Sequence, residues 1–135
     1  MAVVAVTRLR LRDVAQLEDF LTAALALLEQ AKRSTGVLGS DAIAETNSTW
    51  WTCTVWDSRA SMRSFVRTDP HRATMDRLDD WCDEATFVDW EQPGPELPDW
   101  KTSHAHIVAE GQSATLTYAS PANATLDFPV PVPAT

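Results

Sequence analysis

Alternating side chains predict two strands near the start of this chain. Residues 3–11, VVAVTRLRL, are rich in β-branched residues and alternate from Val6 onward. Residues 49–56, TWWTCTVW, form the strongest strand pattern, with Trp50 and Trp56 on one face and Trp51 on the other. Because both faces of this strand carry tryptophan, we expect both faces to be covered.

Apolar residues at three- and four-residue steps predict a helix over about 14–34. Asp13 stands where its carboxylate can cap the first turn, and Gly36 suits a left-handed cap at the end. A weaker second strand follows around Ile43, and residues 46–48 are typical of a hairpin turn.

A second helical region begins after residues 57–58 and restarts at Pro70. One side of the restarted segment carries an arginine and four aspartates. The other side is apolar apart from one histidine and consists of His71, Met75, Leu78 and Cys82. We therefore expect His71 to point inward, with a fourth strand following over 85–90.

The order β-α-β-β-α-β predicts an α+β fold of ferredoxin-like topology, with both helices on one face of a four-stranded antiparallel sheet. Residues 1–92 would form this domain. Residues 93–118 would add a linker and a short helix, capped by Asp99 and ended by Gly111, that packs on the same domain. Two strand-like pieces, ATLTY and ATLDF, follow that helix, and residues 119–135 would form a proline-rich extended tail. The uncovered sheet face predicts a homodimer, since a twofold mate would bury it.

Composition and charge narrow the partners of this 135-residue chain. Its formal net charge of -8 disfavours nucleic acid and membrane surfaces as partners. The N-terminus lacks the order of a signal peptide, and no apolar stretch is long enough to cross a bilayer. Two cysteines, Cys53 and Cys82, fit buried free thiols in a reducing compartment, so we expect a cytoplasmic protein.

Tryptophan is the compositional outlier, because all six tryptophans fall between positions 50 and 100. Such clustering suits either a core or a flat apolar ligand site. Trp50, Trp51 and Trp56 could therefore stack on a polycyclic ligand or simply fill the core.

His71 is the first candidate for chemistry, because imidazole exchanges protons near neutral pH and is the usual haem ligand. The alternative is a core histidine bonded to a backbone carbonyl. Met75, one turn further on, could contact a ligand or only pack. Arg8 and Arg10 share a strand face, where they could bind a carboxylate or a haem propionate, or instead pair with surface acids.

Other classes of site lack support in this sequence. On a helix, His104 and His106 diverge by about 200° and cannot ligate one metal together, whereas on a strand they could. No spacing matches a structural zinc site, a phosphate-binding glycine loop or a G-x-S-x-G nucleophile turn.

The run from Trp50 to Trp90, WWTCTVWDSRASMRSFVRTDPHRATMDRLDDW followed by FVDW, resembles a bacterial family related to spheroidene monooxygenase. That DUF3291-like family is similar to the antibiotic biosynthesis monooxygenases, which are dimeric α+β barrels. The resemblance covers about residues 3–111. It implies a homodimer with face-to-face sheets and a pocket between each sheet and its helices. The haem degraders of this superfamily use an Asn, a Trp and a His that this chain does not reproduce, since Phe65 falls near their Trp and His71 lies earlier than their His.

By analogy, the resemblance implies a small monooxygenase acting on a hydrophobic aromatic or polyene secondary metabolite. We expect His71 as the base and no cofactor, with substrate contacts from Trp50, Trp51, Trp56, Phe65, Met75, Arg8 and Arg10. Two alternatives stay open at this stage. One is a haem-dependent enzyme with His71 as the axial ligand, and the other is a non-catalytic dimer that binds a small apolar molecule.

Overall fold

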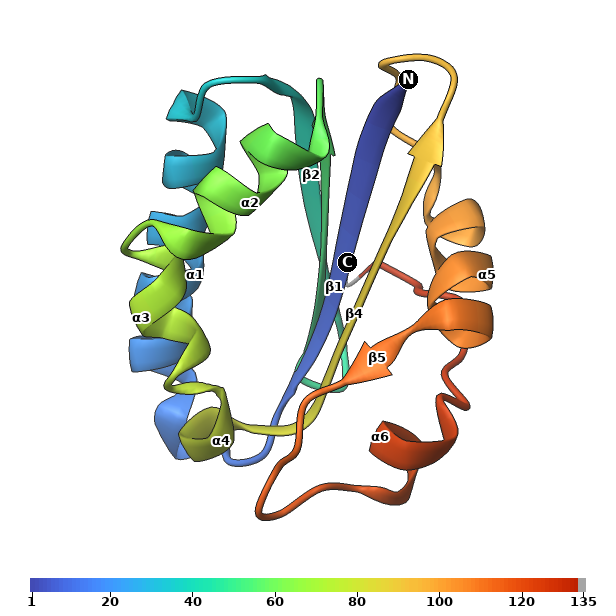
Figure 1. Ribbon diagram of the computed structural model, residues 1–135. Helices are drawn as coiled ribbons and strands as arrows, with labels where there is room; N and C mark the ends of the chain where they lie inside the picture. The colour runs from blue at the N-terminus through green and yellow to red at the C-terminus, as the bar shows by residue number, and fades with distance from the viewer. Residues whose placement is uncertain (134–135) are drawn as a thin grey trace.

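Strands that are far apart in the sequence lie side by side in one antiparallel sheet, in the order β2-β3-β1-β4-β5. The computed structural model describes residues 1–133 (Figure 1). The strands are β1 (Ala2–Leu11), β2 (Val37–Glu45), β3 (Thr49–Trp56), β4 (Cys82–Gln92) and β5 (Gln112–Ser113). The helices are α1 (Leu17–Arg33), α2 (Arg59–Arg67), α3 (His71–Met75), α4 (Leu78–Trp81), α5 (Trp100–Glu110) and α6 (Pro121–Thr125), with a 3₁₀ turn at Val14–Gln16.

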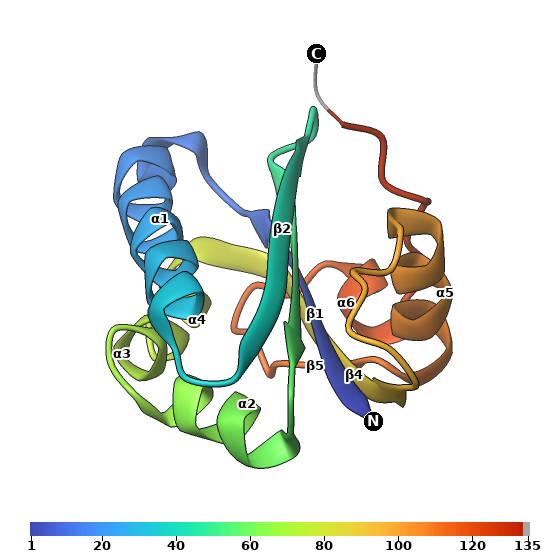
Figure 2. The ribbon, with the colours of Figure 1, turned by 90° about the horizontal axis from the view of Figure 1, so that it is seen from above.

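The helices form two layers, one on each side of the sheet (Figures 1 and 2). The first layer consists of α1 to α4, and the second of α5, α6 and the C-terminal segment. Strands β1 to β4 with α1 and the α2–α4 region reproduce the predicted β-α-β-β-α-β order, which confirms the ferredoxin-like α+β fold.

Short polar residues set several element boundaries as the sequence indicates. Asp13 accepts a hydrogen bond from the Ala15 N–H (2.9 Å), and Gly36 adopts a positive φ of 88° after α1. The hairpin turn between β2 and β3 ends at Ser48 with a φ of 60°. Asp99 accepts from the Thr102 N–H (2.7 Å) and caps α5 as predicted.

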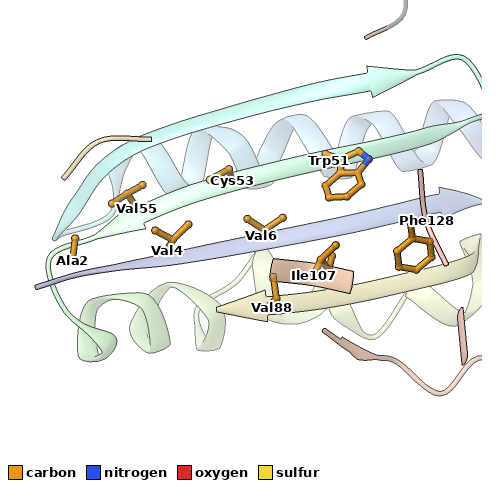
Figure 3. Close-up of a cluster of buried hydrophobic side chains, with 9 residues drawn as sticks. All are labelled: Ala2, Val4, Val6, Trp51, Cys53, Val55, Val88, Ile107 and Phe128. Carbon is orange, nitrogen blue, oxygen red and sulfur yellow. The ribbon is translucent and has the colours of Figure 1, made fainter. Parts of the chain in front are cut away.

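One hydrophobic cluster fills the space between the sheet and α5 (Figure 3). Alternate residues of the central strands, such as Val4 and Val6 on β1, point to this face. Ile107 of α5 and Phe128 of the C-terminal segment pack on them and are 0% and 4% exposed. The full cluster consists of Ala2, Val4, Val6, Trp51, Cys53, Val55, Val88, Ile107 and Phe128.

The C-terminal region differs from the sequence expectation. Residues 114–118 and 124–128 are not strands; residues 121–125 form α6. The first part of the expected tail is ordered instead, because Asn123 is buried and joins it to the sheet, whereas residues 129–133 form neither helix nor strand and are mostly exposed. The Asn123 side chain accepts from the Ala85 N–H (2.9 Å) and donates to the Ala114 carbonyl (3.0 Å). Residues 134–135 of the predicted tail lie outside the described part.

This C-terminal layer also removes the reason for which a homodimer was expected. The sheet face that a twofold mate would have buried is already covered by the chain's own α5, α6 and Phe128. A homodimer of this chain stays a proposal and would have to use another surface.

Two further details correct the sequence reading. The second helical region is split into α2, α3 and α4, and the fourth strand begins at Cys82 rather than at residue 85. Cys82, the last residue of the apolar side that was predicted to begin at His71, therefore lies on a strand and not on a helix. No helix among residues 1–133 combines the length and the apolar character needed to span a membrane.

Candidate functional site

A cavity of about 610 Å³ lies between the sheet and the layer formed by α1 to α4. This volume falls in the range of pockets that hold small organic ligands, about 300–1,000 Å³. It also lies where the resemblance placed a pocket. The cavity persists because small side chains stand where large ones would fill it, among them Ala5 and Ala42 on the strands and Ala24 on α1.

The floor of the cavity is a row of residues in register across the sheet. Thr7 of β1 is paired with Thr52 on one side and with Phe87 on the other. Ala42 of β2 and Gln112 of β5 extend the row to the two outer strands. All these residues line the cavity, so its floor crosses the whole sheet.

Aromatic and thioether side chains make up most of the walls. Phe20 of α1 packs on Trp50 with ring centroids 4.7 Å apart, and on Trp81 at 5.8 Å with nearly perpendicular rings. These contacts fit the geometry that aromatic pairs prefer. The large apolar residues that line the cavity are Phe20, Trp50, Met62, Phe65, Met75, Leu78, Trp81 and Phe87.

His71 lines the cavity from the first turn of α3, as predicted. Its Nδ1 lies 3.1 Å from the Val66 carbonyl oxygen, and its backbone N–H donates to Oε1 of Gln30 (2.9 Å). Because a carbonyl can only accept, Nδ1 carries the proton in this contact. The ring is held further by edge contact with Phe65, with centroids 4.7 Å apart.

This arrangement leaves Nε2 of His71 as an acceptor with no hydrogen-bond partner among residues 1–133. Burial lowers the pKa of His71 below its ordinary value, and the hydrogen bond to the Val66 carbonyl opposes that effect only in part. The imidazole is therefore neutral at pH 7. A neutral imidazole with one free nitrogen in an apolar cavity can accept a proton from a bound molecule.

Phe65, Met75 and Trp50 also border the cavity. Trp56 does not line it. Its ring stacks beneath Phe65 at 5.0 Å, and its N–H donates to Oγ1 of Thr54 (2.8 Å), so Trp56 supports the wall from behind.

Trp51 is among the residues that border the cavity, but its side chain packs in the cluster on the opposite face of the sheet, where the side chains of Arg8 and Arg10 also lie. The Trp51 indole packs on Trp100 of α5, at a centroid distance of 6.4 Å, and donates to Glu45 (2.8 Å). Arg8 is buried against Glu84, with its guanidinium 4.0 Å from the Phe128 ring centroid.

Arg10 pairs with the same Glu84 carboxylate at 2.8 Å. Arg8 and Arg10 lie on the face away from the cavity because they occupy even positions of β1, whereas the odd positions face it. The expectation that they bind a ligand in this cavity is wrong.

The sequence reading missed Phe20, Trp81 and the two floor threonines. Alternation does place Thr7 with Leu9 and Thr52 with Trp50, but it does not reveal that helices leave this part of the sheet open. Trp81 was missed because it lies on α4, a helix separate from α3. The apolar side that begins at His71 therefore does not tell which way the side chains of α4 point.

Metal chemistry finds no support in the described residues. Among residues 1–133, no group of three or more His, Cys, Asp or Glu side chains is placed to hold a metal ion. His104 instead contacts the Phe128 carbonyl oxygen (2.6 Å), and His106 stacks on Trp90 with centroids 3.8 Å apart. Cys53 and Cys82 are free and buried.

Comparison with known proteins places this fold and cavity in a family. The sequence pattern of the antibiotic biosynthesis monooxygenase family matches residues 2–77, which is more than half of the chain. The chain belongs to the antibiotic biosynthesis monooxygenase family. The matched region contains β1 to β3, His71 and Met75. No curated protein matches the chain.

Solved structures agree with the fold of this antibiotic biosynthesis monooxygenase family member. A putative antibiotic biosynthesis monooxygenase from Nitrosomonas europaea has a TM-score of 0.61 at 18% identity and covers 70% of this chain and 92% of its own. SnoaB from Streptomyces nogalater, a cofactor-independent oxygenase, has a TM-score of 0.57 at 12% identity, covering 69% and 94%. Rv0793 from Mycobacterium tuberculosis reaches 0.62 at 9% identity, covering 70% and 97%. At these identities, the likeness shows the shared fold alone.

Proposed function

We propose that this protein is a monooxygenase that oxidises a hydrophobic aromatic or polyene molecule in the cavity without a cofactor. One observation carries the proposal: an apolar cavity holds a neutral imidazole whose Nδ1 is engaged and whose Nε2 is an acceptor without a partner in the described part of the chain. Family membership supports the reaction class, and the cofactor-independent oxygenase SnoaB offers a precedent for the same fold.

The chemistry begins with proton transfer to Nε2 of His71 from a phenol or from the carbon acid of its keto tautomer. The resulting anion is rich in electrons and gives one electron to O₂, which forms a substrate radical and superoxide. The two radicals combine in a carbon–oxygen bond, and the peroxide takes back the proton held by His71. Loss of water from this hydroperoxide leaves a carbonyl group, so one oxygen atom enters the product and the other leaves as water.

The walls of the cavity suit an aromatic substrate. Few polar groups line the cavity, and its aromatic residues offer flat surfaces against a polycyclic ring. Trp50 lines the cavity, and its indole N–H has no hydrogen-bond partner within residues 1–133, so it is free to donate to the oxygen of the anion.

The haem alternative fits the residues less well. Nε2 of His71 could act as an axial ligand, but haem also carries two propionates that need cationic or polar partners. No Arg or Lys lines the cavity in the described chain, and Arg8 and Arg10 are engaged on the opposite face. The choice between an aromatic and a polyene substrate is a separate question. A closer relation of this chain to the spheroidene monooxygenase-related branch would favour a polyene.

The test is oxygen consumption with a tricyclic anthrone, the keto tautomer of an anthracenol. We expect protein-dependent O₂ uptake, with one O₂ consumed per quinone formed, by the purified chain without added metal or flavin. His71→Gln should lose most of this rate, whereas His106→Gln, which alters an imidazole outside the cavity, should keep it. Equal uptake by the parent and by His71→Gln would refute the assignment of the base. Ligand binding without any uptake would favour the non-catalytic alternative.

A further inference from the structure

We propose that Thr7 and Thr52 form the polar subsite of the cavity, and that the ligand is an elongated, uncharged molecule with a hydroxyl or carbonyl oxygen placed on these two side chains. This inference rests on the proposed use of the cavity as a ligand site, but it does not require that His71 be a base.

The two threonines are direct neighbours at the centre of the floor. Thr7 of β1 and Thr52 of β3 are in register, so their Cβ atoms lie about 4.5–5.5 Å apart on the same face. The central strands of a covered sheet normally bury such positions. Both residues are only half-buried here, because the cavity stands over them.

Other threonines of these central strands have hydrogen-bond partners, whereas this pair does not. Thr54 accepts from the Trp56 indole, and Thr86 bonds Ser113 at 2.8 Å. Within residues 1–133, no hydrogen bond satisfies the side chain of Thr7 or Thr52. Hydroxyls that face an apolar space without partners are unfavourable unless a water or a ligand binds them. The pair is therefore a donor and acceptor set for a ligand oxygen.

The floor sets the shape of the ligand. The row of Ala42, Thr52, Thr7, Phe87 and Gln112 crosses all five strands, and both end residues line the same cavity. With neighbouring strands about 4.8 Å apart, such a row spans about 19 Å. A long, flat or thin molecule lying across the strands fits this floor, with its middle over the threonine pair.

Charge disfavours a ligand that arrives as an anion, whereas the anion of the proposed reaction forms inside the cavity beside the protonated His71. The described lining contains no Lys or Arg, and its charged members are Asp89 and Glu110. Asp89 is paired with Arg59 at 2.6 Å, so the Arg59 guanidinium already has a carboxylate partner and is not free for a ligand anion. A ligand carboxylate would lose its hydration in this cavity and find no cationic partner, which favours neutral molecules.

Three fluorescent probes of the same size separate these elements. Anthracene has no oxygen, 2-hydroxyanthracene adds one neutral hydroxyl, and anthracene-2-carboxylate adds an anion. Their binding can be followed by fluorescence anisotropy at submicromolar probe, excited beyond the absorption of tryptophan. We expect 2-hydroxyanthracene to bind tightest and the carboxylate weakest.

The variant Thr7→Val/Thr52→Val keeps the side-chain shape and removes both hydroxyls. It should weaken 2-hydroxyanthracene by about tenfold, as expected for one or two neutral hydrogen bonds, and leave anthracene within about twofold. Thr7→Ser/Thr52→Ser should restore the preference, and Thr115→Val, an exposed position outside the cavity, should change nothing.

Several results would overturn the subsite. These are unchanged binding of 2-hydroxyanthracene by the valine variant, an equal loss for anthracene, tighter binding of the carboxylate than of the hydroxyl probe, or no binding of any probe. Absence of O₂ uptake would count against the oxygenase proposal only. A hydroxyl preference that depends on these threonines would still establish the subsite in that case.

Discussion

Replacing His71 by alanine separates a catalytic histidine from a structural one. The change removes the Nδ1–H bond to the Val66 carbonyl, which contributes about 1 kcal/mol, and the edge contact with Phe65, which contributes about 0.5–1.5 kcal/mol. The backbone N–H of residue 71 keeps its bond to Gln30. The ring borders an existing cavity, so its removal enlarges that space instead of opening a new one in the packed core.

The expected loss of stability is therefore about 2 kcal/mol, which corresponds to a melting temperature lower by about 5–10 °C in a domain of this size. Below that temperature, thermal unfolding and O₂ uptake can be measured on the same samples. We expect the His71→Ala variant to stay folded and to lose at least about 100-fold in rate, the usual contribution of a general base. His106→Ala serves as the matched control. A variant that melts far earlier than this yet turns over at the parental rate while folded would show that His71 is a core residue.

Four other predictions follow from the structure. Burial lowers the pKa of His71 below its ordinary value of 6.5, and its described contacts (Phe65, Val66 and Gln30) are uncharged. The value of kcat/KM should therefore be flat above neutral pH and fall only in acid. A fall that begins above pH 7 would show that the pKa of His71 is not lowered. Burial alone would raise the pKa of Glu84, but hydrogen bonds from Arg8, Ser120 and Arg10 lower it overall, so this carboxylate stabilises the fold at neutral pH and loses that contribution as pH falls through its folded pKa. Glu84→Gln should cost about 3–5 kcal/mol in urea unfolding, against no more than about 0.5 kcal/mol for exposed Glu96→Gln. Phe128→Asp should displace the C-terminal segment and raise the mass measured by light scattering above that of the parent, and an unchanged mass would mean that this segment does not shield the sheet. Burial raises the pKa of both Cys53 and Cys82 to about 12, so alkylation without reductant should give two labels in denaturant and almost none in the native protein.

Local patterns predicted the elements of the first 92 residues because each pattern has a local physical cause. The cap at Asp13, the left-handed residue at Gly36 and the alternation of residues 49–56 depend only on neighbouring residues, and all three are present. The inward direction of His71 followed from the charges on the opposite side of its helix. Its Nδ1 is held by the Val66 carbonyl of α2, which is the kind of backbone partner that the core-histidine alternative named.

The errors arise where contacts join distant parts of the chain. The choice of sheet face for Arg8 depends on Glu84, 76 residues away, and on Phe128. Residues 119–135 were predicted to form an extended tail because prolines favour extended backbone. The first part of this tail is ordered by single side chains such as Asn123, which satisfies the Ala85 N–H and the Ala114 carbonyl. Neither effect has a periodicity that sequence reasoning could detect.

One face of the sheet is tightly packed and the other borders the cavity, and this difference explains how the fold keeps a large apolar cavity. An unfilled volume of about 610 Å³ forfeits packing that would otherwise stabilise the domain. The opposite face compensates with a continuous cluster in which Val4, Val55 and Ile107 are fully buried (Figure 3). Because α5 and the C-terminal segment supply that packing within one chain, the layer of α1 to α4 need not close fully on the strands. The residues that stabilise the fold and those that would handle a ligand are thus largely on opposite faces of one sheet, so most variants of Thr7, Thr52 and His71 should change binding or turnover more than stability.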